Sequence, residues 1–414
     1  MIECNCKKEV LKFDKMNGEN AAEIRRILSA KNPYRTCDFT FGIALFWGDY
    51  FDGEYCVFRD TVFGKNKNPA FISENGENGY SFLLPAGGLS IDESVGFLIE
   101  YARENGEKTL VLKSVPEAAA EYLREKFGAK VCELADFGDY LYSAESLATL
   151  KGHKYNKKRN RVNQFKKNYP NYSFENVTGE NLGKIFELLG KIKSEQNADM
   201  KTENETAENA DTDIIESEIK NKTIDINSAT KNEIAENADT DIIESEIKDK
   251  TIDINSVTKN EIAENADTDI IESEIKNKTI DINSVTKNEI IESTAEKLKT
   301  TAAYEANQIE KVLNDFESLG LPCRALFVGE RAVAFTVGEV VGDTLYTHVE
   351  KADKDYEGAY QMINYLFAEE MRAKFSVEYI NREDDLGDAG LRRAKASYYP
   401  IEILKKYRAE IEIN

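Results

Sequence analysis

The densest group of reactive side chains in this chain lies near its C-terminal end. A strand-like segment, 344–350, carries one of the two histidines, and a run of charged and polar residues follows at 380–395. His348 and Glu350 are two positions apart, so on a regular strand they would share one face. One of them could then act as a base while the other orients it. We therefore predict that both are catalytic, with a hydrogen-bonded structural pair as the alternative.

The run at 380–395 offers acids and bases beside a strand end. Its acidic residues suit an amino group or a proton, and Arg392 and Lys395, three positions apart, suit a phosphate or carboxylate. A helix-capping loop with surface ion pairs would look the same in sequence. We predict that Asp384 is catalytic, that Tyr398 is either a general acid or a packing residue, and that the substrate is bound by Asn381, Arg382, Glu383 and Asp385.

A second segment with chemical character is strongly basic. Nine of the seventeen residues in 151–167 are Lys, Arg or His. On a helix, Lys154, Lys157, Lys158 and Arg161 would recur at spacings of three and four and share one face. Such a face suits a polyanion, namely the phosphates of a nucleotide, of a coenzyme or of tRNA. The alternative is a solvated surface helix.

The formal charge of −22 over 414 residues is unevenly distributed. Three near-identical 28-residue copies, 207–234, 235–262 and 263–290, hold nine lysines against 22 acidic residues, more than half of that charge. They contain no aromatic residue and no leucine, so they would bury too little apolar surface to offset the entropy of ordering them. We expect 197–294 to be a flexible insertion outside the active fold.

The rest of the composition bears on metal binding and on the location of the protein. Six scattered cysteines and two histidines do not form a four-ligand zinc set, so we expect no metal site. The N-terminus has no apolar segment of the signal-peptide kind. No apolar run approaches the ~20 residues of a membrane span. We expect a cytoplasmic protein without a transmembrane segment.

The elements that would position these side chains are mixed helices and strands. In the first part we expect strands at 55–59, 70–72, 79–85, 109–112 and 139–142, and helices at 15–31, 90–105 and 116–127. In the second part we expect a strand and a helix within 175–196, helices at 295–319, 356–375 and 390–397, and strands at 323–328, 332–339, 344–350 and 377–380.

The order of elements after residue 295 resembles the acetyltransferase (GNAT) fold. Three blocks are similar to the C-terminal domain family of phosphatidylglycerol lysyltransferase: 155–160, 348–352, and 380–387 with 391–395. The resemblance implies an α/β (α+β) fold with two tandem GNAT-like subdomains, related to the Fem-type aminoacyltransferases. We expect subdomains at 1–145 and at 146–196 plus 295–414, the second interrupted by the insertion at 197–294.

The same resemblance implies a function. It predicts transfer of an aminoacyl group from aminoacyl-tRNA, held by the basic face, to an amine or hydroxyl acceptor such as a lipid headgroup, with no bound cofactor. It also implies that Gly358, at a helix start, helps to hold the donor phosphates. Three acidic residues surround this glycine, which argues for a donor other than coenzyme A. The alternatives are an acyl-coenzyme A-dependent N-acyltransferase and a non-catalytic binding or scaffold protein.

Overall fold

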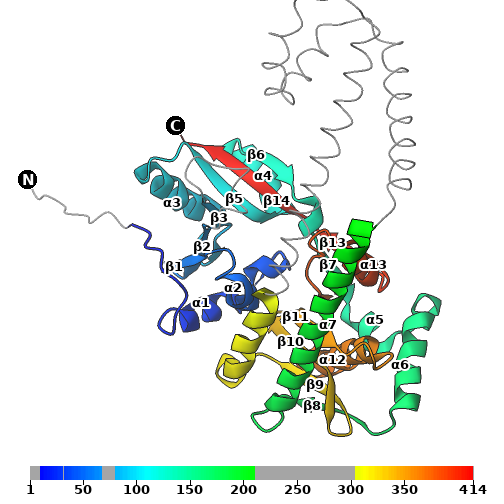
Figure 1. Ribbon diagram of the computed structural model, residues 1–414. Coiled ribbons are helices and arrows are strands. Elements are labelled where there is room, and N and C mark those ends of the chain that lie inside the picture. Colours follow the sequence, from blue (N-terminus) through cyan, green and yellow to red (C-terminus); the bar gives the residue numbers. More distant parts are fainter. Residues whose placement is uncertain (1–9, 31, 68–79, 210–303, 414) are drawn as a thin grey trace, which may run out of the picture. The chain divides into compact units, whose positions relative to one another are not determined.

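The computed structural model describes residues 10–30, 32–67, 80–209 and 304–413, with the backbone alone described over 196–209. The chain divides into two compact units, Met1–Ser194 with Ala302–Asn414, and Glu195–Thr301. The expected repeats lie outside the described residues from 210 onward, as does the expected strand at 70–72. The first unit holds two β-sheets and carries all the candidate site residues (Figure 1).

The first sheet is mostly antiparallel, with one parallel pair, β3 with β5. Helix α3 begins with a capping box in which Ser90 and Glu93 satisfy each other's backbone N–H groups. Its buried Val95 and Leu98 pack with Leu112 of the sheet. In order, the strands are β1 (Glu54–Phe58), β2 (Thr61–Asn66), β3 (Ser81–Leu83), β5 (Thr109–Pro116), β14 (Lys406–Glu412) and β6 (Lys130–Glu133), with β4 (Ala86–Gly87) beside β2; the helices are α1 (Ala21–Leu28), α2 (Phe41–Trp47), α3 (Ile91–Glu104) and α4 (Glu117–Phe127).

The second sheet is also mostly antiparallel, with β11 and β12 parallel. Its strand order is β13 (Glu402–Leu404), β7 (Asp139–Ser143), β12 (Tyr379–Asn381), β11 (Thr344–Ala352), β10 (Arg331–Val341), β9 (Cys323–Val328) and β8 (Tyr172–Asn176). The surrounding helices are α5 (Ala144–Thr149), α6 (Asn156–Asn168), α7 (Leu182–Asn209), a helix over 304–319, α12 (Ala359–Phe375) and α13 (Ala389–Ala396), with short 3-10 turns at η1 (Cys37–Phe39), η3 (Ala135–Phe137) and η4 (His153–Tyr155).

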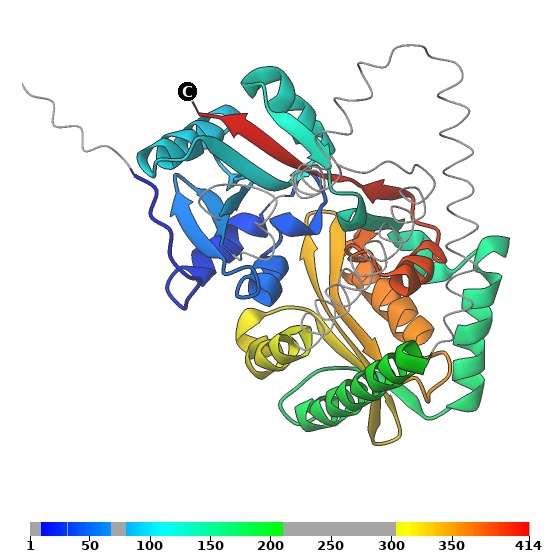
Figure 2. The ribbon, with the colours of Figure 1, turned by 45° about the horizontal axis from the view of Figure 1, so that its top comes forward.

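Two strands cross between the sheets. β7, from the first part of the chain, pairs with β12 and β13 in the second sheet. β14, at the C-terminal end, pairs with β5 and β6 in the first sheet, where it is the red strand among cyan ones in Figures 1 and 2. The expected subdomains, 1–145 and 146–196 plus 295–414, do not include this exchange of strands. The exchange joins the two subdomains through backbone hydrogen bonds.

Different helices cover the two faces of the second sheet. On β11, Leu345 packs with Phe367 of α12, whereas the next residue, Tyr346, packs with Ile43 of α2. Because successive strand residues point to opposite faces, α12 and α2 lie on opposite faces of this sheet. The candidate site residues are therefore divided between an α2 face and an α12 face.

Candidate active site

A β-bulge on β11 decides where its polar side chains point. Val349 pairs with Val337 of β10, but the next pair along is Thr347 with Gly338, so His348 has no residue opposite it. The His348 ring lies on the α2 face, 5.9 Å from that of Phe46. Glu350 instead accepts a hydrogen bond from Asn364 of α12. The prediction that His348 and Glu350 share a face is wrong, because the extra residue interrupts the alternation.

On the α2 face, His348 lies between two carboxylates, and we call this group the histidine cluster. Its Nδ1 is 2.8 Å from Oε1 of Glu383, and its Nε2 is 3.4 Å from Oε2 of Glu339. The His348 side chain is only 1% exposed. Burial lowers the pKa of His348, but the two glutamates outweigh it and raise that pKa to about 9. At neutral pH the ring is therefore an imidazolium with no free lone pair for a base.

Helix α2 packs over the histidine cluster. The backbone N–H of Gly42 donates to Glu339 at 2.7 Å. A Cβ atom at position 42 would lie 2.1 Å from Nε2 of His348, so only glycine lets α2 approach the ring. The histidine cluster thus fixes α2 and the loop after β12 onto the sheet.

A second buried ion group, the lysine cluster, lies where the sheets meet. Nζ of Lys406 is 2.6 Å from Asp38, 2.7 Å from Asp139 and 3.7 Å from Asp384. Burial lowers the pKa of Lys406, but Asp139 and Asp38 outweigh it and raise that pKa well above its ordinary value. The ammonium lies among Cys37, Asp38 and Asp139, which could otherwise hold a metal ion. Burial raises the pKa of Asp384 to about 7.

Several residues predicted to bind substrate or phosphate instead make contacts that hold their own loop. Asn381 is fully buried and donates to Asp139 at 2.9 Å and to the carbonyl oxygen of Arg35 at 2.7 Å. Arg392 donates twice to Asp385, both times at 2.8 Å. Lys395 donates to the carbonyl oxygens of Arg382, at 2.6 Å, and Asp384. These contacts order the loop between β12 and α13.

On the α12 face lies a group with unsatisfied atoms, which we call the arginine cluster: Arg382, Glu350, Asn364 and Lys158. Nη2 of Arg382 donates to Glu350 at 2.7 Å, and Nδ2 of Asn364 donates to the other Glu350 oxygen at 3.0 Å. Nη1 of Arg382 and Oδ1 of Asn364 are buried and have no hydrogen-bond partner among the described residues. A group that accepts from Arg382 and donates to Asn364 would satisfy both.

Lys158 of α6 reaches toward this cluster. Its Nζ is 2.6 Å from Oγ of Ser397 and 3.9 Å from the centre of the Tyr398 ring, which the Arg382 guanidinium also contacts at 4.9 Å. Burial, together with the charge of Arg382, lowers the pKa of Lys158 to about 8. Burial raises the pKa of Tyr398, so its hydroxyl stays protonated at neutral pH and its ring forms a wall against the two cations.

The other residues of the predicted basic face lie at the surface. α6 begins at Asn156, so Lys154 belongs to the preceding 3-10 turn, where it contacts the ring of Tyr399. Arg161 forms an ion pair with Glu357. Lys157 is exposed and has no hydrogen bond or ion pair to any residue within the described ranges. Only Lys158 points inward.

The position of Gly358 has a packing explanation. This residue precedes α12 with φ of 90°, and a Cβ atom there would lie 2.7 Å from the carbonyl oxygen of Arg161. Glycine is therefore needed for α6 to pack against the start of α12. The backbone of α6, rather than open space, lies beside the predicted phosphate-binding glycine.

Sequence reasoning did not single out Asn364, Glu339 or Lys406. Asn364 carries a usable signal, since it shares a helical stripe with Ala368 and Met371, both buried. A polar residue on such a stripe must find a partner inside the protein. Lys406 lies in β14, whose partner β5 comes from a distant segment of the chain. Glu339 lies in β10, which pairs with its sequence neighbour β11, where it contacts His348.

Comparison with solved structures defines the class of fold. The chain is similar to a conserved protein of unknown function from Bacteroides thetaiotaomicron, with 25% identity and a TM-score of 0.62 over 97% of this chain and all of that one. It is also similar to the C-terminal domain of a putative lysylphosphatidylglycerol synthetase from Agrobacterium fabrum, with 12% identity and a TM-score of 0.51 over 96% of this chain and 93% of that one. L-PGS from Bacillus licheniformis gives 11% identity and a TM-score of 0.50 over 97% and 93% of the two chains. The fold is that of the tandem GNAT-like acyltransferases, as predicted.

Sequence comparison then identifies the family. The family described as "Phosphatidylglycerol lysyltransferase, C-terminal" matches residues 42–208 and 276–410, so the chain belongs to it, as the resemblance predicted. An uncharacterised protein of Mycoplasmoides gallisepticum is 29% identical over 92 residues, which are 22% of this chain and 29% of that relative. The chain therefore matches less than a third of that relative's length.

Membership and fold together support an aminoacyltransferase kind of function. Within the described ranges, no helix combines the length and the apolar character that crossing a membrane requires.

Proposed function

We propose that this protein transfers an aminoacyl group from aminoacyl-tRNA to an amine or hydroxyl acceptor, with a lipid headgroup hydroxyl as the first acceptor to test. Family membership supports this class of reaction. The observation that carries the proposal is the arginine cluster. It combines a buried guanidinium nitrogen without a partner and a lysine whose pKa is about 8.

The reaction needs a proton carrier and a donor for the developing oxyanion. Lys158 in its neutral form takes the proton that the acceptor loses as its nitrogen or oxygen attacks the ester carbonyl carbon. Arg382 donates to the carbonyl oxygen as it gains negative charge. The bond from that carbon to the ribose oxygen then breaks, and the Lys158 ammonium returns the proton to the ribose oxygen. A pKa near 8 suits both steps at neutral pH.

Access to this cluster requires a local movement. Nη1 of Arg382 has no exposed surface, and Tyr398, which is 5% exposed, contacts both cations. Entry of the donor must therefore displace Tyr398 or a neighbouring side chain. The exposed cations of the same region, Lys154, Lys157 and Arg161, are suited to the phosphates of the tRNA acceptor end.

The test is a transfer assay with the purified full-length chain. Aminoacyl-tRNA carrying a labelled amino acid is supplied with phosphatidylglycerol vesicles or with a simple amine, and labelled product is counted. We expect label in the acceptor, and its loss in Lys158→Met but not in Lys151→Met, an exposed lysine of the same basic segment. Saturable acetyl-coenzyme A binding without transfer would support the N-acyltransferase alternative. Binding of neither donor would support a non-catalytic protein.

A further inference from the structure

Exposed apolar side chains gather at one edge of the second sheet. Among the described residues, nine large hydrophobic side chains are 38–54% exposed, and five of these lie within 386–403. The other four are spread from residue 10 to residue 375. Single exposed apolar residues are ordinary, whereas a group of them marks an interaction surface. We call this group the apolar edge: Leu386, Leu391, Tyr399, Ile401 and Ile403.

One side of the apolar edge is β13, which is the outermost strand of the second sheet (Figure 1). Among the described strands, β13 pairs only with β7, where Ile403 lies opposite Tyr140. Cγ2 of Ile403 is 2.7 Å from the place that a Cβ atom on Gly138 would take, so this isoleucine lies against the backbone directly after η3. Ile401, just before β13, is 54% exposed.

The other side of the apolar edge is α13 with the loop before it. A Cβ atom on Gly387 would lie 3.5 Å from Asp136 of η3, and Arg392 of α13 pairs with the same aspartate at 2.8 Å. Leu386 and Leu391 are the chain neighbours of these two contacts. Leu386, Leu391 and Ile403 therefore lie around one short turn, although they come from three different elements.

Tyr399 connects the apolar edge to the arginine cluster. It is 44% exposed, whereas Tyr398, the residue before it, is 5% exposed and forms the wall against Lys158. The ring of Tyr399 is 5.6 Å from that of Tyr155, and Nζ of Lys154 is 5.3 Å from the centre of the Tyr399 ring. A molecule held on the apolar edge would therefore lie beside the side chain that must move to open the cluster.

The surroundings of the apolar edge are cationic in an otherwise acidic protein. Residues 386–405 include four Lys or Arg and two acidic residues, and the adjoining segment 151–167 has eight Lys or Arg and no acidic residue. The side chain of Arg393, on α13, is exposed and forms no hydrogen bond or ion pair within the part of the chain that the structure describes. Apolar side chains beside cations, with a tyrosine between them, suit a membrane surface that contains anionic lipid.

We propose that the apolar edge docks this protein on the surface of an anionic lipid bilayer. The leucine and isoleucine side chains would enter the boundary between headgroups and acyl chains, and Arg393 would pair with a headgroup phosphate. RNA is disfavoured as the occupant, because its phosphates would leave the isoleucines in water. The inference extends the proposed function and rests on it in one respect, since a docked bilayer would present lipid headgroups as acceptors beside Tyr398.

Vesicle flotation of the full-length chain tests the docking surface without tRNA. Phosphatidylcholine vesicles are compared with vesicles that also contain phosphatidylglycerol. We expect binding to the second kind, weakened by salt. The double variant Ile401→Ser with Ile403→Ser should weaken this binding by roughly tenfold or more, because two apolar side chains no longer enter the boundary. Arg393→Gln should weaken it by roughly fivefold.

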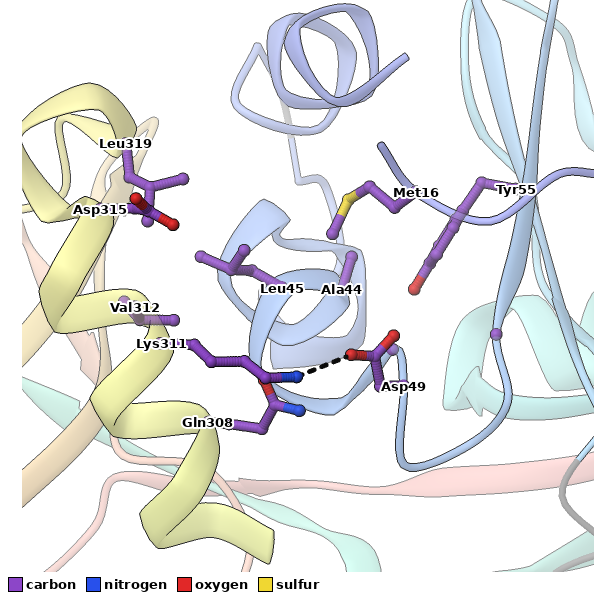
Figure 3. A pocket seen from close by; sticks show the side chains of 12 residues that line it. Met16, Ala44, Leu45, Asp49, Tyr55, Gln308, Lys311, Val312, Asp315 and Leu319 are labelled. Carbon is purple, nitrogen blue, oxygen red and sulfur yellow. Dashed lines mark hydrogen bonds and ion pairs between the residues drawn. The ribbon is translucent and has the colours of Figure 1, made fainter. Parts of the chain in front are cut away.

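Matched control variants lie elsewhere on the protein. Val10→Ser removes an apolar side chain that is 48% exposed and should leave vesicle binding unchanged. Lys311→Gln changes the net charge by the same amount as Arg393→Gln and should also leave it unchanged. Lys311 lines a cavity of about 210 Å³ between α2 and the helix over 304–319, where its Nζ is 3.4 Å from Asp49 (Figure 3).

Three results would overturn the docking surface: no binding to vesicles with phosphatidylglycerol, equal binding to both kinds of vesicle, or unchanged binding in the double isoleucine variant. Transfer to a soluble amine separates this proposal from the transfer reaction. Transfer without vesicle binding would mean that the docking surface alone is wrong. Vesicle binding without transfer to either acceptor would support the docking surface and contradict the proposed reaction.

Discussion

Two lysines of this protein are shielded from water, but their surroundings shift their pKa values in opposite directions. Lys406 is 2% exposed, contacts carboxylates of Asp38 and Asp139 within 2.7 Å, and has a strongly raised pKa. Lys158 is half-buried and forms no ion pair with any residue that the structure describes. It meets a hydroxyl, an aromatic ring and the positive charge of Arg382, and its pKa falls to about 8. The first lysine is held as a cation by its surroundings, and the second is poised to lose its proton.

The same difference separates the two faces of the second sheet. On the α2 face, His348 has a carboxylate near each ring nitrogen, at 2.8 Å from Nδ1 and 3.4 Å from Nε2, although Nε2 has no hydrogen-bond partner within the described residues. On the α12 face, Arg382 shares a single carboxylate and keeps a buried nitrogen without a partner. Compensated charges add little driving force for a reaction, whereas uncompensated ones are stabilised by a ligand or transition state that completes them. Because two carboxylates offset the charge of His348, we expect the chemistry at the arginine cluster rather than at this histidine.

The largest expected effect is on stability, at the lysine cluster. Lys406→Met should lower the free energy of unfolding by roughly 3–5 kcal/mol, because it leaves buried carboxylates without their counter-ion. Urea unfolding followed by near-ultraviolet circular dichroism measures this. The control is Lys405→Met, whose exposed side chain is 3.1 Å from Glu133 and should contribute at most about 1 kcal/mol. Similar unfolding midpoints for the two variants would show that Lys406 is not compensating buried charge.

The histidine cluster should make stability depend on pH. The pKa of His348 rises from 6.5 to about 9 on folding, so its contribution is complete below pH 6.5 and is lost as pH rises through about 9. A shift of this size corresponds to about 3 kcal/mol. His348→Gln should flatten the fall in stability across that window, measured by urea unfolding at a series of pH values. His153→Gln, which changes the exposed second histidine, should retain the slope of the original protein.

Much of the fold follows from local sequence chemistry. The helices predicted at 90–105 and 116–127 are α3 and α4, since the first has its capping box and the second ends at Gly128 in a left-handed conformation. The strands predicted at 323–328 and 332–339 are β9 and β10. Helix α2 was not predicted, because its aromatic residues and Gly42 resemble strand and turn signals. Its glycine is explained only by the His348 ring against which it packs.

The location of polar chemistry was easier to predict than its arrangement. The run at 380–395 does lie among all three polar clusters. Which of its residues meet which partners depends on a strand from far along the chain, β7, whose Asp139 accepts a hydrogen bond from Asn381 and whose Tyr140 donates one to Asp385. The bulge at His348 reverses the face on which Glu350 is found, and residue alternation alone cannot reveal it. Long-range pairing therefore sets the limit of prediction at this site.

If Lys158 carries the proton, replacing this lysine should slow the reaction without destabilising the fold. Lys158→Met should reduce aminoacyl transfer by about a hundredfold, the lower end of what a positioned acid–base group contributes. Its unfolding free energy should not fall, since burying this ammonium beside Arg382 opposes folding, as its lowered pKa indicates. The pH–rate profile of the unmodified protein should bend near pH 8, and the bend should disappear in the variant. A rate loss matched by lost stability would return Lys158 to a structural role like that of Lys406.

The smallest expected effect concerns the exposed part of the basic segment. Lys157 has no hydrogen bond or ion pair to any residue in the described ranges, so an RNA phosphate could pair with it without breaking an existing contact. Lys157→Ala should weaken aminoacyl-tRNA binding severalfold and reduce the slope of log affinity against log salt by about one. Fluorescence anisotropy titrations with labelled aminoacyl-tRNA at several salt concentrations measure both quantities. The control is Lys126→Ala on α4, an exposed lysine beside the first sheet, which should leave the slope unchanged. Equal slopes for Lys157→Ala and Lys126→Ala would mean that tRNA does not contact α6, and the proton-carrying role of Lys158 would then need a donor that reaches it by another path.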